Sequence, residues 1–422
     1  MSPRGFRAPR GTTDVLPSDQ KLWDYFLVRA EEAAARFGYN RIETPMFEDA
    51  DLFIHGTGKV TDIVEKETYT FEDRGGDLLT LRPEGTPSVC RSYLEHGMHN
   101  LPQPIRLYYT GPFFRYDRPQ AGRYRQFHQF GIEVIGEADE SMDSEVIELA
   151  WRILESVGIE SVSLQLNSIG DSECRPTYIH NLQSYYQSRL DELIHEDCKR
   201  RLENNPLRLL DCKNATCQPL IAQAPSSIDH LCDSCTNHWN SLLEHLGSIQ
   251  IPYQIDKRLV RGLDYYSRTV FEIVPPGQGQ QNTLVGGGRY DGLIEILGGK
   301  PTPGIGFSIG IERVLANLKE KDFTESSQPK ELVFFAHMGK KPKKLALTLC
   351  SQLRSNMVAA VLAPSDRSLK SQLRYASAIN ATHAAILGDR ELEKGVVVVR
   401  DLAKSEQQEV NPKDLLSMFT VR

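Results

Sequence analysis

The stretch from Leu259 to Glu272 reads LVRGLDYYSRTVFE, and the interpretation of the whole chain starts from it. It places an arginine, an aspartate and two tyrosines between apolar residues at the alternation of a strand. Four polar side chains share one face of that strand: Arg261, Tyr265, Ser267 and Thr269. Because adjacent side chains point to opposite faces, at most one of Tyr265 and Tyr266 is expected to line a given pocket. Taken alone, the stretch is typical of an exposed edge strand with an ordinary Arg–Asp ion pair.

Length and composition indicate a multidomain globular protein. At 422 residues the chain exceeds the ~250–300 residues at which single cores stop growing, so two or three domains are expected. Its 40% hydrophobic and 25% charged residues are ordinary, and no uncharged apolar run approaches the length of a membrane span. The start, MSPRGFRAPRG, lacks the apolar core of a secretory signal. Eight cysteines without such a signal indicate reduced thiols, and therefore a cytoplasmic protein without a membrane partner.

Charge is distributed unevenly along the chain. Residues 330–422 contain 15 lysines and arginines against 9 aspartates and glutamates, a net charge of +6. Because the whole chain carries −7, residues 1–329 carry −13. A basic C-terminal domain on an acidic body suggests a polyanionic partner.

The N-terminal part is expected to contain a long helix and a hairpin. Pro17 begins the helix, and a strand interrupted by Pro45 follows it. Since proline in a strand marks an edge or an interface, the Pro45 segment is a candidate subunit contact. The next two strands form a hairpin that turns at Gly75-Gly76, and RPEGT at residues 82–86 leads into a second helix.

Residues 105–136, IRLYYTGPFFRYDRPQAGRYRQFHQFGIEVIG, are expected to form a second, longer hairpin of two aromatic-rich strands. Its loop carries cationic and amide side chains suited to phosphate and nucleic-acid contacts, although a solvated hairpin tip would also be charged: Arg118, Gln120, Arg123 and Arg125. On the returning strand Gln129 and Glu133 point to the same side. A carboxylate and an amide buried on one sheet face indicate a polar ligand.

The pattern of expected helices and strands divides the remaining chain into three parts. Residues 143–158 are expected to be helical and residues 162–170 a strand, and from 171 to 247 helices predominate. Strands and glycine turns resume from 248 to 325, and a polar linker leads to residues 330–422. That last part alternates strands and helices, which is typical of an α/β domain. Its expected elements are strands at 331–336, 359–363, 383–388 and 395–402, with helices at 341–355 and 368–380.

Clustered cysteines in the helical part suggest a metal site. Four of them form two pairs separated by fourteen residues: Cys212, Cys217, Cys232 and Cys235. His230 and His238 lie nearby, and a CxxC pair places two thiolates on one tetrahedral face. Two interpretations remain open, a single structural zinc site of these four cysteines or unliganded thiols in a small helical insertion.

Four motifs, in this order and spacing, resemble those of histidyl-tRNA synthetase: RPEGT at 82–86, FRYDRPQAGRYRQFHQ at 114–129, RGLDYY at 261–266 and GIGFSIGIERV at 304–314. The resemblance extends from PRGTTDVLP at residues 9–17 to the last strand. RGLDYY is specific to this family, whereas the hairpin and the final glycine-rich motif are shared by class II synthetases.

The resemblance implies an α+β catalytic domain with the antiparallel sheet of the class II synthetase fold, a helical insertion and a C-terminal α/β anticodon-binding domain. The catalytic domain would comprise residues 1–170 and 248–325, the insertion 171–247, and the anticodon-binding domain 330–422. The resemblance also implies a homodimer formed through the Pro45 segment.

The same resemblance implies an ATP-dependent ligase. Histidine would be activated with ATP to histidyl-adenylate, releasing diphosphate, and then transferred to the 3′ end of tRNA(His). The histidine carboxylate and the α-phosphate are both anionic, so cations must neutralise their approach. Arg115 and Arg261 match the family's arginines at the α-phosphate, and Arg313 matches the one that lies over the adenine and reaches the γ-phosphate. ATP is expected with Mg²⁺, although Arg261 serves where related enzymes rely more on metal.

Six residues match the family's histidine site: Glu84, Thr86, Gln129, Glu133, Tyr265 and Tyr266. In the family, residues at the first three positions hold the ammonium group, and those at Glu133 and Tyr266 bind the imidazole. A buried carboxylate and a phenol that an apolar analogue would leave unpaired explain selectivity without an editing step.

Two further groups of residues complete the expected site. Gly304, Gly306 and Gly310 would let the nucleotide approach the strand closely. The hairpin residues Arg118, Gln120 and Arg123 match the element that meets the acceptor end of tRNA.

Several competing interpretations remain. Residues 306–310 also fit G-x-S-x-G, the serine hydrolase elbow, but no HGGG-type oxyanion motif accompanies them. Residues 286–288, three glycines, either cradle a phosphate or form a bulged turn. A catalytically inactive paralogue that regulates histidine biosynthesis would be expected to lack RGLDYY and the C-terminal domain. A nucleic-acid accessory protein is disfavoured by the intact set Arg115, Arg261 and Arg313.

Overall fold

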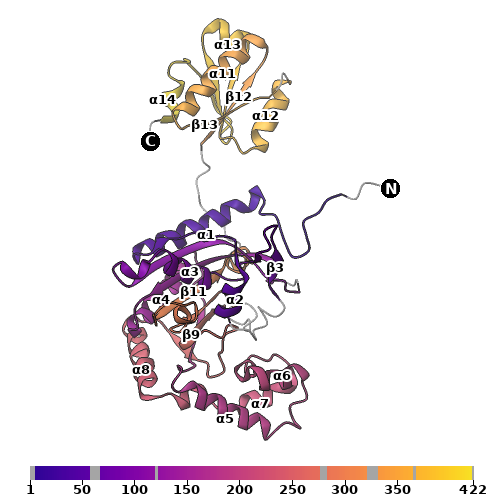
Figure 1. Cartoon of the computed structure of the whole chain (residues 1–422). Coiled ribbons are helices and arrows are strands. Elements are labelled where there is room, and N and C mark those ends of the chain that lie inside the picture. The colour runs from indigo at the N-terminus through magenta and orange to yellow at the C-terminus, as the bar shows by residue number, and fades with distance from the viewer. Residues whose placement is uncertain are drawn as a thin grey trace. The chain divides into compact units, whose positions relative to one another are not determined.

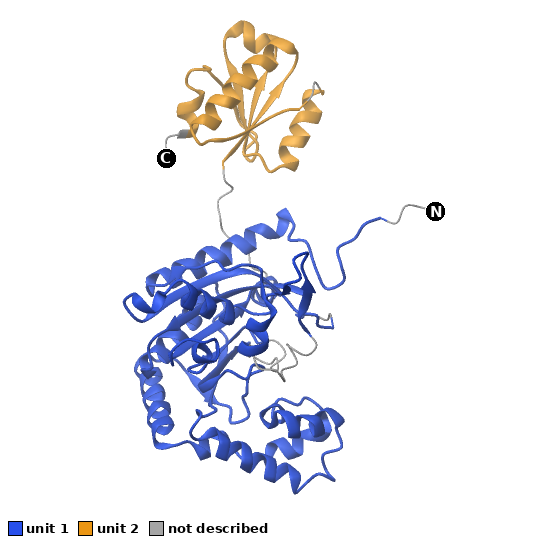
Figure 2. Cartoon of the chain, in the orientation of Figure 1, with its two compact units in different colours: residues 1–323 blue, residues 324–422 orange. Residues whose placement is uncertain are grey.

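The structure of the chain is a computed structural model that describes residues 5–57, 67–118, 122–275, 283–320, 331–364 and 367–420. It divides into two compact units, residues 1–323 and residues 324–422 (Figure 2). The division falls beside the expected polar linker. Among the described residues, no helix has the length and apolar character that a membrane span requires.

The first unit is built on an eight-stranded sheet, labelled in part in Figure 1. In order across the sheet its strands are β1 (Asn40–Arg41), β5 (Ile105–Phe114), β6 (Gln126–Ile135), β11 (Gly304–Gly310), β10 (Val285–Arg289), β9 (Ser267–Val274), β7 (Ser163–Ser168) and β8 (Tyr253–Ile255). Only the edge pairs β1–β5 and β7–β8 are parallel. The predicted antiparallel sheet and the long hairpin β5–β6 are therefore confirmed.

One face of this sheet is covered by helices. They are α1 (Pro17–Arg36), α4 (Glu140–Ser156), α8 (Asp233–Ser248) and α10 (Ile311–Glu320). Along β6, Phe130, Ile132 and Val134 pack into the core beneath them. By the alternation of the strand, Gln129 and Glu133 point to the opposite face, as predicted. That opposite face is the one available for a ligand.

Smaller elements border the opposite face. A three-stranded sheet has the order β2 (Phe47–Asp49), β4 (Leu78–Leu81) and β3 (Tyr69–Glu72), which confirms the hairpin around Gly75-Gly76. Helices α2 (Ala50–Thr57), α3 (Thr86–Glu95) and α9 (Leu293–Ile296) pack together, and the 3₁₀ turn η2 (Met98–Asn100) follows α3. Helix α3 starts at Thr86, the last residue of RPEGT, with Pro87 in its first turn, where proline costs no hydrogen bond.

The stretch Leu259–Glu272 differs from its prediction. Its strand, β9, begins only at Ser267, and residues 259–266 form an irregular segment with turns. Side chains of other elements hold this segment: Asn167 Nδ2 donates to the Leu259 carbonyl at 2.9 Å, and Arg175 Nη2 donates to the Tyr266 carbonyl at 2.5 Å. Because these bonds replace a strand ladder, the alternation of side chains expected for residues 259–266 does not apply.

The triple glycine at residues 286–288 also differs from the bulged turn expected by default. It lies within β10, fully buried and paired on both sides, and the register shift falls between Gly288 and Arg289. A Cβ at Gly286 would collide with the guanidinium of Arg261, and a Cβ at Gly288 would meet the ring of Tyr266. The glycines therefore make room for side chains of the RGLDYY segment rather than for a turn.

The insertion is a small helical lobe with a core of its own. It contains α5 (Arg175–Gln187), α6 (Glu196–Asn204), η3 (Pro206–Leu209), η4 (Ala215–Cys217), α7 (Gln218–Ala222) and η5 (Ser227–His230). Figure 1 shows α5, α6 and α7 grouped away from the sheet. Helix α8 was expected within the insertion at 171–247, but its buried residues Trp239, Leu242 and Leu246 belong to the core of the main sheet. Its apolar face packs against α4, so α8 is part of the body.

The second unit is an α/β domain, as predicted. Its sheet has the order β13 (Ala359–Leu362), β12 (Leu332–His337), β14 (His383–Leu387), β15 (Val397–Asp401) and β16 (Gln407–Val410). The first three strands are parallel and the last two antiparallel. The helices are α11 (Lys340–Ser355), α12 (Leu369–Ala378), α13 (Asp389–Lys394) and α14 (Leu415–Thr420), of which α13 and α14, like β16, were not predicted.

Candidate active site

A cavity of about 710 Å³ lies on the open face of the eight-stranded sheet. Its walls come from segments far apart in the sequence: residues 84–86 before α3, strands β5, β6, β10 and β11, the RGLDYY segment, the start of α10, and part of the insertion. This volume is within the range of small-molecule sites. Most of the residues predicted for histidine and ATP are among those that line it.

Two buried polar groups in the cavity have unused acceptor atoms. Glu84 Oε2 accepts a hydrogen bond from the Tyr265 hydroxyl at 2.7 Å, while Glu84 Oε1 has no partner among the described residues. Gln129 Nε2 donates to Ser308 Oγ at 3.2 Å, and the Gln129 Oε1 atom likewise has none. A buried acceptor without a donor is costly, so the site is suited to a ligand that donates hydrogen bonds.

Glu133 lies beneath the cavity wall and does not line the cavity. Three hydroxyl groups donate to its carboxylate: Thr86 at 2.6 Å, Tyr290 at 2.6 Å and Tyr109 at 3.4 Å. Tyr109, Tyr290 and Thr86 themselves face the cavity. Sequence reasoning missed both tyrosines, since neither belongs to a motif, although Tyr109 stands in the aromatic run of β5.

Burial dominates the acid–base properties of these carboxyl groups. It raises the pKa of Glu84 to about 7, against the lowering effects of the Tyr265 hydrogen bond, Arg115 and Arg261. It raises the pKa of Glu133 to about 8, although the bonds from Thr86 and Tyr290 oppose the shift. Both groups therefore titrate near neutral pH, where an incoming cation can change their charge.

Both tyrosines of the RGLDYY segment line the cavity, which contradicts the expectation that only one would do so. The ring centroids of Tyr265 and Tyr266 lie 4.8 Å apart, and the ring of Tyr290 is 6.0 Å from that of Tyr265. The expectation required an extended strand, whereas the segment turns at this point. The two rings can therefore share one wall.

Arg261 lies flat above Gly286, in the space that a side chain on β10 would fill. Its Nη1 pairs with the carboxylate of Glu272, and its Nε has no acceptor among the described residues. Burial alone would lower the pKa of Arg261, but Glu272 and Tyr266 together raise it above its usual value. The guanidinium therefore stays charged and keeps an unused donor.

Five more guanidinium groups line the cavity with Arg261: those of Arg115, Arg123, Arg201, Arg208 and Arg313. Arg115 Nε donates to the Pro83 carbonyl at 3.0 Å, and Arg313 Nη1 donates to the Thr283 carbonyl at 2.8 Å. Arg123 pairs with Asp117 at 3.1 Å. Burial, then Arg123 and Arg115, lower the pKa of Arg313. Mutual repulsion of this kind favours a polyanionic ligand, which would relieve it.

The three glycines predicted to admit a nucleotide have different surroundings. A Cβ at Gly304 would collide with the Tyr290 ring, and one at Gly306 with the Glu133 carboxylate. At these two positions the protein's own side chains occupy the space, which differs from the expected reason. Gly310 borders the cavity next to Arg313, and a Cβ there would make only ordinary contact.

The hairpin loop that is predicted to meet the acceptor end of tRNA is described only in part. The backbone N–H of Arg118 donates to Asp117 Oδ1 at 2.6 Å, and Arg123 reaches the other oxygen of the same carboxylate. Gln120 lies outside the described residues. The predicted acceptor contacts of this loop stay predictions.

Ser308, the centre of the G-x-S-x-G match, lies in the interior of β11. Its hydroxyl accepts a hydrogen bond from Gln129. A nucleophile elbow needs the serine on a sharp turn between a strand and a helix, and α10 starts only at Ile311, after the strand has ended. The hydrolase interpretation is therefore wrong.

The cysteines of the insertion form two clusters, so the interpretation as a single site of all four does not hold. Cys212 and Cys217 lie with His195 and Cys198, whereas Cys232 and Cys235 lie with Asp171 and Cys174. His238 is bonded to Asp143 at 2.8 Å and His230 to the Ser226 carbonyl at 2.9 Å, so neither completes a cluster. Tertiary packing therefore combines each pair of cysteines with two residues that precede that pair in the sequence.

The insertion also supplies one wall of the cavity, which sequence reasoning did not foresee. These lining residues are His195, Arg201, Arg208, Asp211, Cys212, Lys213 and Asn214. Asn205 Nδ2 donates to Asp264 Oδ1 at 2.7 Å and so joins the insertion to the RGLDYY segment. In the sequence, only the basic residues of this region could have indicated that it contacts an anionic ligand.

An antiparallel sheet with helices on one face, and a cavity of arginines and buried acceptors on the other, defines a class II aminoacyl-tRNA synthetase. A family model described as histidyl-tRNA synthetase matches residues 11–314, and a model of an anticodon binding domain matches residues 332–422. The chain belongs to the histidyl-tRNA synthetase family.

Similar proteins agree with this assignment. A histidine–tRNA ligase from Dehalococcoides mccartyi is 53% identical over 97% of this chain and 98% of its own length, and one from Desulforamulus reducens is 46% identical over 98% and 99%. The crystal structure of apo S. aureus histidyl-tRNA synthetase has a TM-score of 0.83 at 36% identity, covering 98% of this chain and 100% of that one. The chain is thus a ligase that joins histidine to tRNA, and a regulatory subunit of histidine biosynthesis is not supported.

Proposed function

We propose that the cavity binds histidine and ATP side by side, joins them to histidyl-adenylate with release of diphosphate, and then transfers histidine to the 3′ end of tRNA(His). The observation that carries this proposal is the pairing of unused buried acceptors with six guanidinium groups in one cavity. The acceptors suit an ammonium group, and the arginines suit a triphosphate. The carboxylate of a histidine bound between the acceptors and the arginines would lie next to the α-phosphate of ATP.

The ammonium group of histidine would be held by Glu84 and Gln129. Each offers one Oε1 atom that lacks a donor among the described residues. Thr86, whose hydroxyl bonds Glu133, completes this side of the site. An ammonium group would supply the missing donors and, by its charge, would favour the ionised form of Glu84.

The imidazole would be recognised by Tyr266 and by the carboxylate of Glu133. Because Glu133 lies behind Thr86, Tyr109 and Tyr290, its contribution requires one hydroxyl to turn toward the ligand, or acts through these hydroxyls. Tyr265 supports the arrangement through its bond to Glu84. An apolar analogue would leave these buried polar groups unpaired, which is a strong basis for selectivity.

ATP would bind along the arginines. Arg115 and Arg261 would neutralise the α-phosphate as the histidine carboxylate attacks it, and Arg313 would lie over the adenine and reach the γ-phosphate. Gly310 would border the nucleotide beside Arg313, while Gly304 and Gly306 would act by making room for Tyr290 and Glu133.

Mg²⁺ would enter with ATP as part of the substrate. Glu272 is the carboxylate paired with Arg261, and its other oxygen accepts from the Thr283 hydroxyl at 2.9 Å. Both oxygens of Glu272 therefore have partners within the protein. Arg261, held by this carboxylate, would place its positive charge near the reacting phosphate.

The proposal extends to the tRNA and to the assembly of the enzyme. Arg118, Gln120 and Arg123 would contact the acceptor end, and residues 330–422 would read the anticodon. The chain would act in the cytoplasm as a homodimer through the Pro45 segment. In support of the dimer, several large apolar side chains next to Pro45 and in the three-stranded sheet are exposed: Met46, Phe47, Phe71 and Leu78. Sedimentation velocity of the intact chain measures directly whether it is a dimer.

The test of the proposed chemistry is histidine-dependent exchange between ATP and labelled diphosphate. We expect Tyr266→Phe and Glu133→Gln each to raise the KM for histidine, with the KM for ATP largely unchanged, because in this proposal Tyr266 contacts the imidazole, Glu133 acts on it through the hydroxyls that it binds, and neither contacts the nucleotide. Tyr253→Phe, in β8 and away from the cavity, is the matched control. Unchanged histidine binding in both variants would place the imidazole elsewhere.

A further inference from the structure

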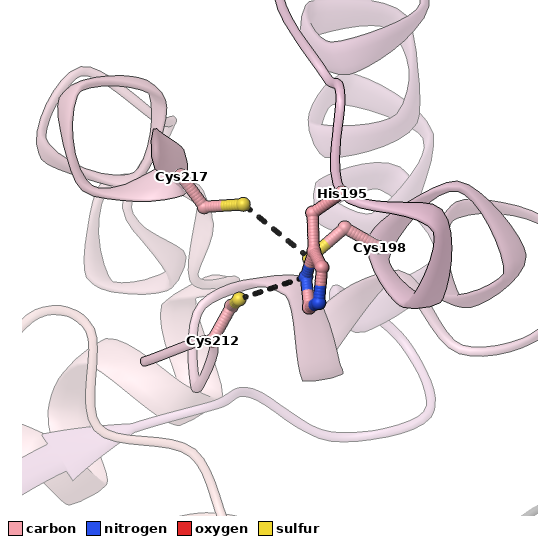
Figure 3. Close-up of side chains that lie close together, drawn as sticks. All are labelled: His195, Cys198, Cys212 and Cys217. Carbon is pink, nitrogen blue, oxygen red and sulfur yellow. Dashed lines mark hydrogen bonds between the residues drawn. The ribbon is translucent and has the colours of Figure 1, made fainter. Parts of the chain in front are cut away.

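One imidazole and three thiols of the insertion converge on a common point (Figure 3). They belong to His195 and Cys198 at the start of α6 and to Cys212 and Cys217 at the ends of the following loop. The four ligand atoms all lie within 4.8 Å of one another, and the three cysteines are buried. Sequence spacing alone did not combine these four residues.

Three of the separations between these atoms lie within about 0.4 Å of the edges of a zinc tetrahedron. With Zn–S at about 2.3 Å and Zn–N at about 2.0–2.1 Å, tetrahedral geometry requires S···S of ~3.8 Å and S···N of ~3.6 Å. Cys198 Sγ and Cys217 Sγ are 3.7 Å apart, far beyond the about 2.05 Å of a disulfide. His195 Nδ1 is 3.2 Å from Cys198 Sγ and 3.4 Å from Cys212 Sγ.

We propose that His195, Cys198, Cys212 and Cys217 bind one structural Zn²⁺ ion. Three sulfur ligands and one nitrogen ligand, with no position left open, are the composition of a structural rather than a catalytic zinc site. The H-x2-C and C-x4-C pairs are each short enough to hold two ligands on one turn. Helix α6 and the turn η3 connect the two pairs, and the fold brings them together.

The surroundings of the ligands also suit a metal. His195 directs Nδ1 into the cluster, and its Nε2 lies 3.9 Å from the carboxylate of Asp197, which is beyond hydrogen-bond distance but leaves a carboxylate beside the second ring nitrogen. The backbone N–H of Asn214 donates to Cys212 Sγ at 3.5 Å, and the Thr216 hydroxyl lies 3.9 Å from Cys217 Sγ. Donors of this kind stabilise thiolates.

The lobe has a structural need for such an ion. Beside α5 and α6 it consists of short turns and a five-residue helix, and its cluster of buried residues includes all three cysteines. Small domains with a small core are commonly held together by a metal. The ion would tie residues 212–217 to the start of α6.

The second cluster, Asp171 with Cys174, Cys232 and Cys235, is explained without a metal. Asp171 Oδ1 accepts from the backbone N–H of Glu173 at 3.0 Å, and Asp171 Oδ2 pairs with Arg268 at 3.2 Å. The carboxylate therefore already caps a turn and forms an ion pair. We assign no ion to this cluster, whose cysteines instead offer controls.

A zinc ion at the first cluster would also shape the active site, in so far as the proposed function holds. His195 and Cys212 line the large cavity, and Lys213 and Asn214 follow Cys212 along the same wall. On the other side of the loop, Asn205 bonds Asp264 within the RGLDYY segment. The ion would hold the loop between α6 and η4, and with it the insertion wall, in place beside the substrates.

Elemental analysis of the full-length protein, purified without chelators, tests the site directly. We expect Cys198→Ala and Cys217→Ala each to lower the zinc content by about one ion per chain relative to the parent. Cys232→Ala, in the second cluster, and Cys350→Ala, a buried thiol of the C-terminal unit, are matched controls that should keep it. Equal zinc content in parent and cluster variants would overturn the proposal.

A second measurement does not depend on the folding of variants. The parent, emptied of metal and refilled with Co²⁺, should show the visible bands of a tetrahedral site and the near-ultraviolet bands of thiolate-to-cobalt charge transfer. A parent that contains no zinc and gives no such bands would overturn the proposal. Neither readout involves histidine, ATP or tRNA, so failure of the zinc site and failure of the proposed function are distinguishable.

Discussion

Two buried carboxyl groups stand within one cavity region, and their partners give them different roles. Glu133 is surrounded by three hydroxyl donors, whereas Glu84 has one donor and one oxygen without a partner in the part of the chain that the structure describes. Burial raises the pKa of both, to about 7 for Glu84 and about 8 for Glu133. The carboxyl group with the free oxygen is the one that a cationic ligand can reach.

The raised pKa of Glu84 predicts a pH dependence of histidine binding. An ammonium group binds the carboxylate form, so below pH of about 7 binding must remove a proton, and the affinity should fall by up to ~tenfold per pH unit. Well above pH 7 the group is already ionised and this dependence should vanish. Calorimetry in two buffers of different ionisation enthalpy measures the released protons.

The imidazole of histidine titrates in the same range, so a matched variant is needed. The glutamine in Glu84→Gln cannot ionise. The difference between the number of protons that the parent and the variant release on binding histidine is therefore the contribution of Glu84. The same number of protons released by parent and variant would show that Glu84 does not meet the ammonium group.

Arg261 should act on the reaction rather than on substrate binding. We expect Arg261→Ala to lower kcat for adenylate formation by ~10²–10³, with little change in the KM for histidine, as for the loss of one preorganised charge at a developing transition state. Pre-steady-state formation of the adenylate measures this step. Arg258→Ala, a half-exposed arginine on the same segment, is the control and should have no such effect. A loss confined to KM would place Arg261 in substrate binding.

At the scale of elements, strand β10 sets the position of Arg261. Its glycines expose bare backbone on which Arg261 and Tyr266 lie. We expect Gly286→Ala to displace the guanidinium and to lower kcat in the same step as Arg261→Ala, with histidine binding kept. Gly292→Ala, where an added Cβ has no neighbour within 4 Å, should leave exchange unchanged. If Gly286→Ala is fully active, the contact between β10 and Arg261 does not matter for catalysis.

Periodicity in the sequence predicted most elements but not the path of residues 259–266. Strands such as β5 and β6 follow from alternating aromatic and polar residues, and α1 follows from its apolar stripe and Pro17. The segment before Ser267 has the same alternation, yet it is held by the side chains of Asn167, Arg175 and Glu84. Contacts from such distant positions leave no trace in local spacing.

The candidate site shows the same limit. Family motifs brought together Glu84, Arg115, Arg261 and Arg313, and the structure places these in one cavity. Tyr109, Tyr290 and the insertion wall belong to no motif, so only the fold reveals them. Spacing grouped the cysteines into two pairs, but the structure places each pair beside different residues from earlier in the sequence.

At the scale of the whole molecule, the domain order could be predicted because the pattern of expected helices and strands changes along the chain. The boundary near residue 324 falls beside a polar linker, and the alternation of strands and helices identified the last domain. The place of α8 could not be predicted in this way. Its Trp239 and Leu242 look like any helical stripe until the core that they join is known.

Separation into two compact units predicts separable functions. The residues of the proposed adenylate site all lie within residues 1–323, and residues 330–422 carry a net positive charge. We expect deletion of residues 330–422 to raise the KM for tRNA steeply while exchange between ATP and diphosphate stays measurable. Gln120→Ala, in the body, should slow transfer to tRNA with exchange preserved, and the two effects should be roughly additive. Charging by the intact chain should weaken with salt, because phosphate contacts release counterions.

Each outcome of the deletion has a distinct meaning. The truncated protein should first be checked by circular dichroism and sedimentation, so that a loss of fold or of dimer is seen directly. If it charges tRNA as well as the intact chain, the C-terminal unit does not contribute to tRNA binding, and the assignment of residues 330–422 is wrong. If it loses exchange as well, the C-terminal unit supports the body itself, and the two units are not functionally separate. Only retained exchange with impaired charging fits an anticodon-binding unit that leaves the chemistry to the body.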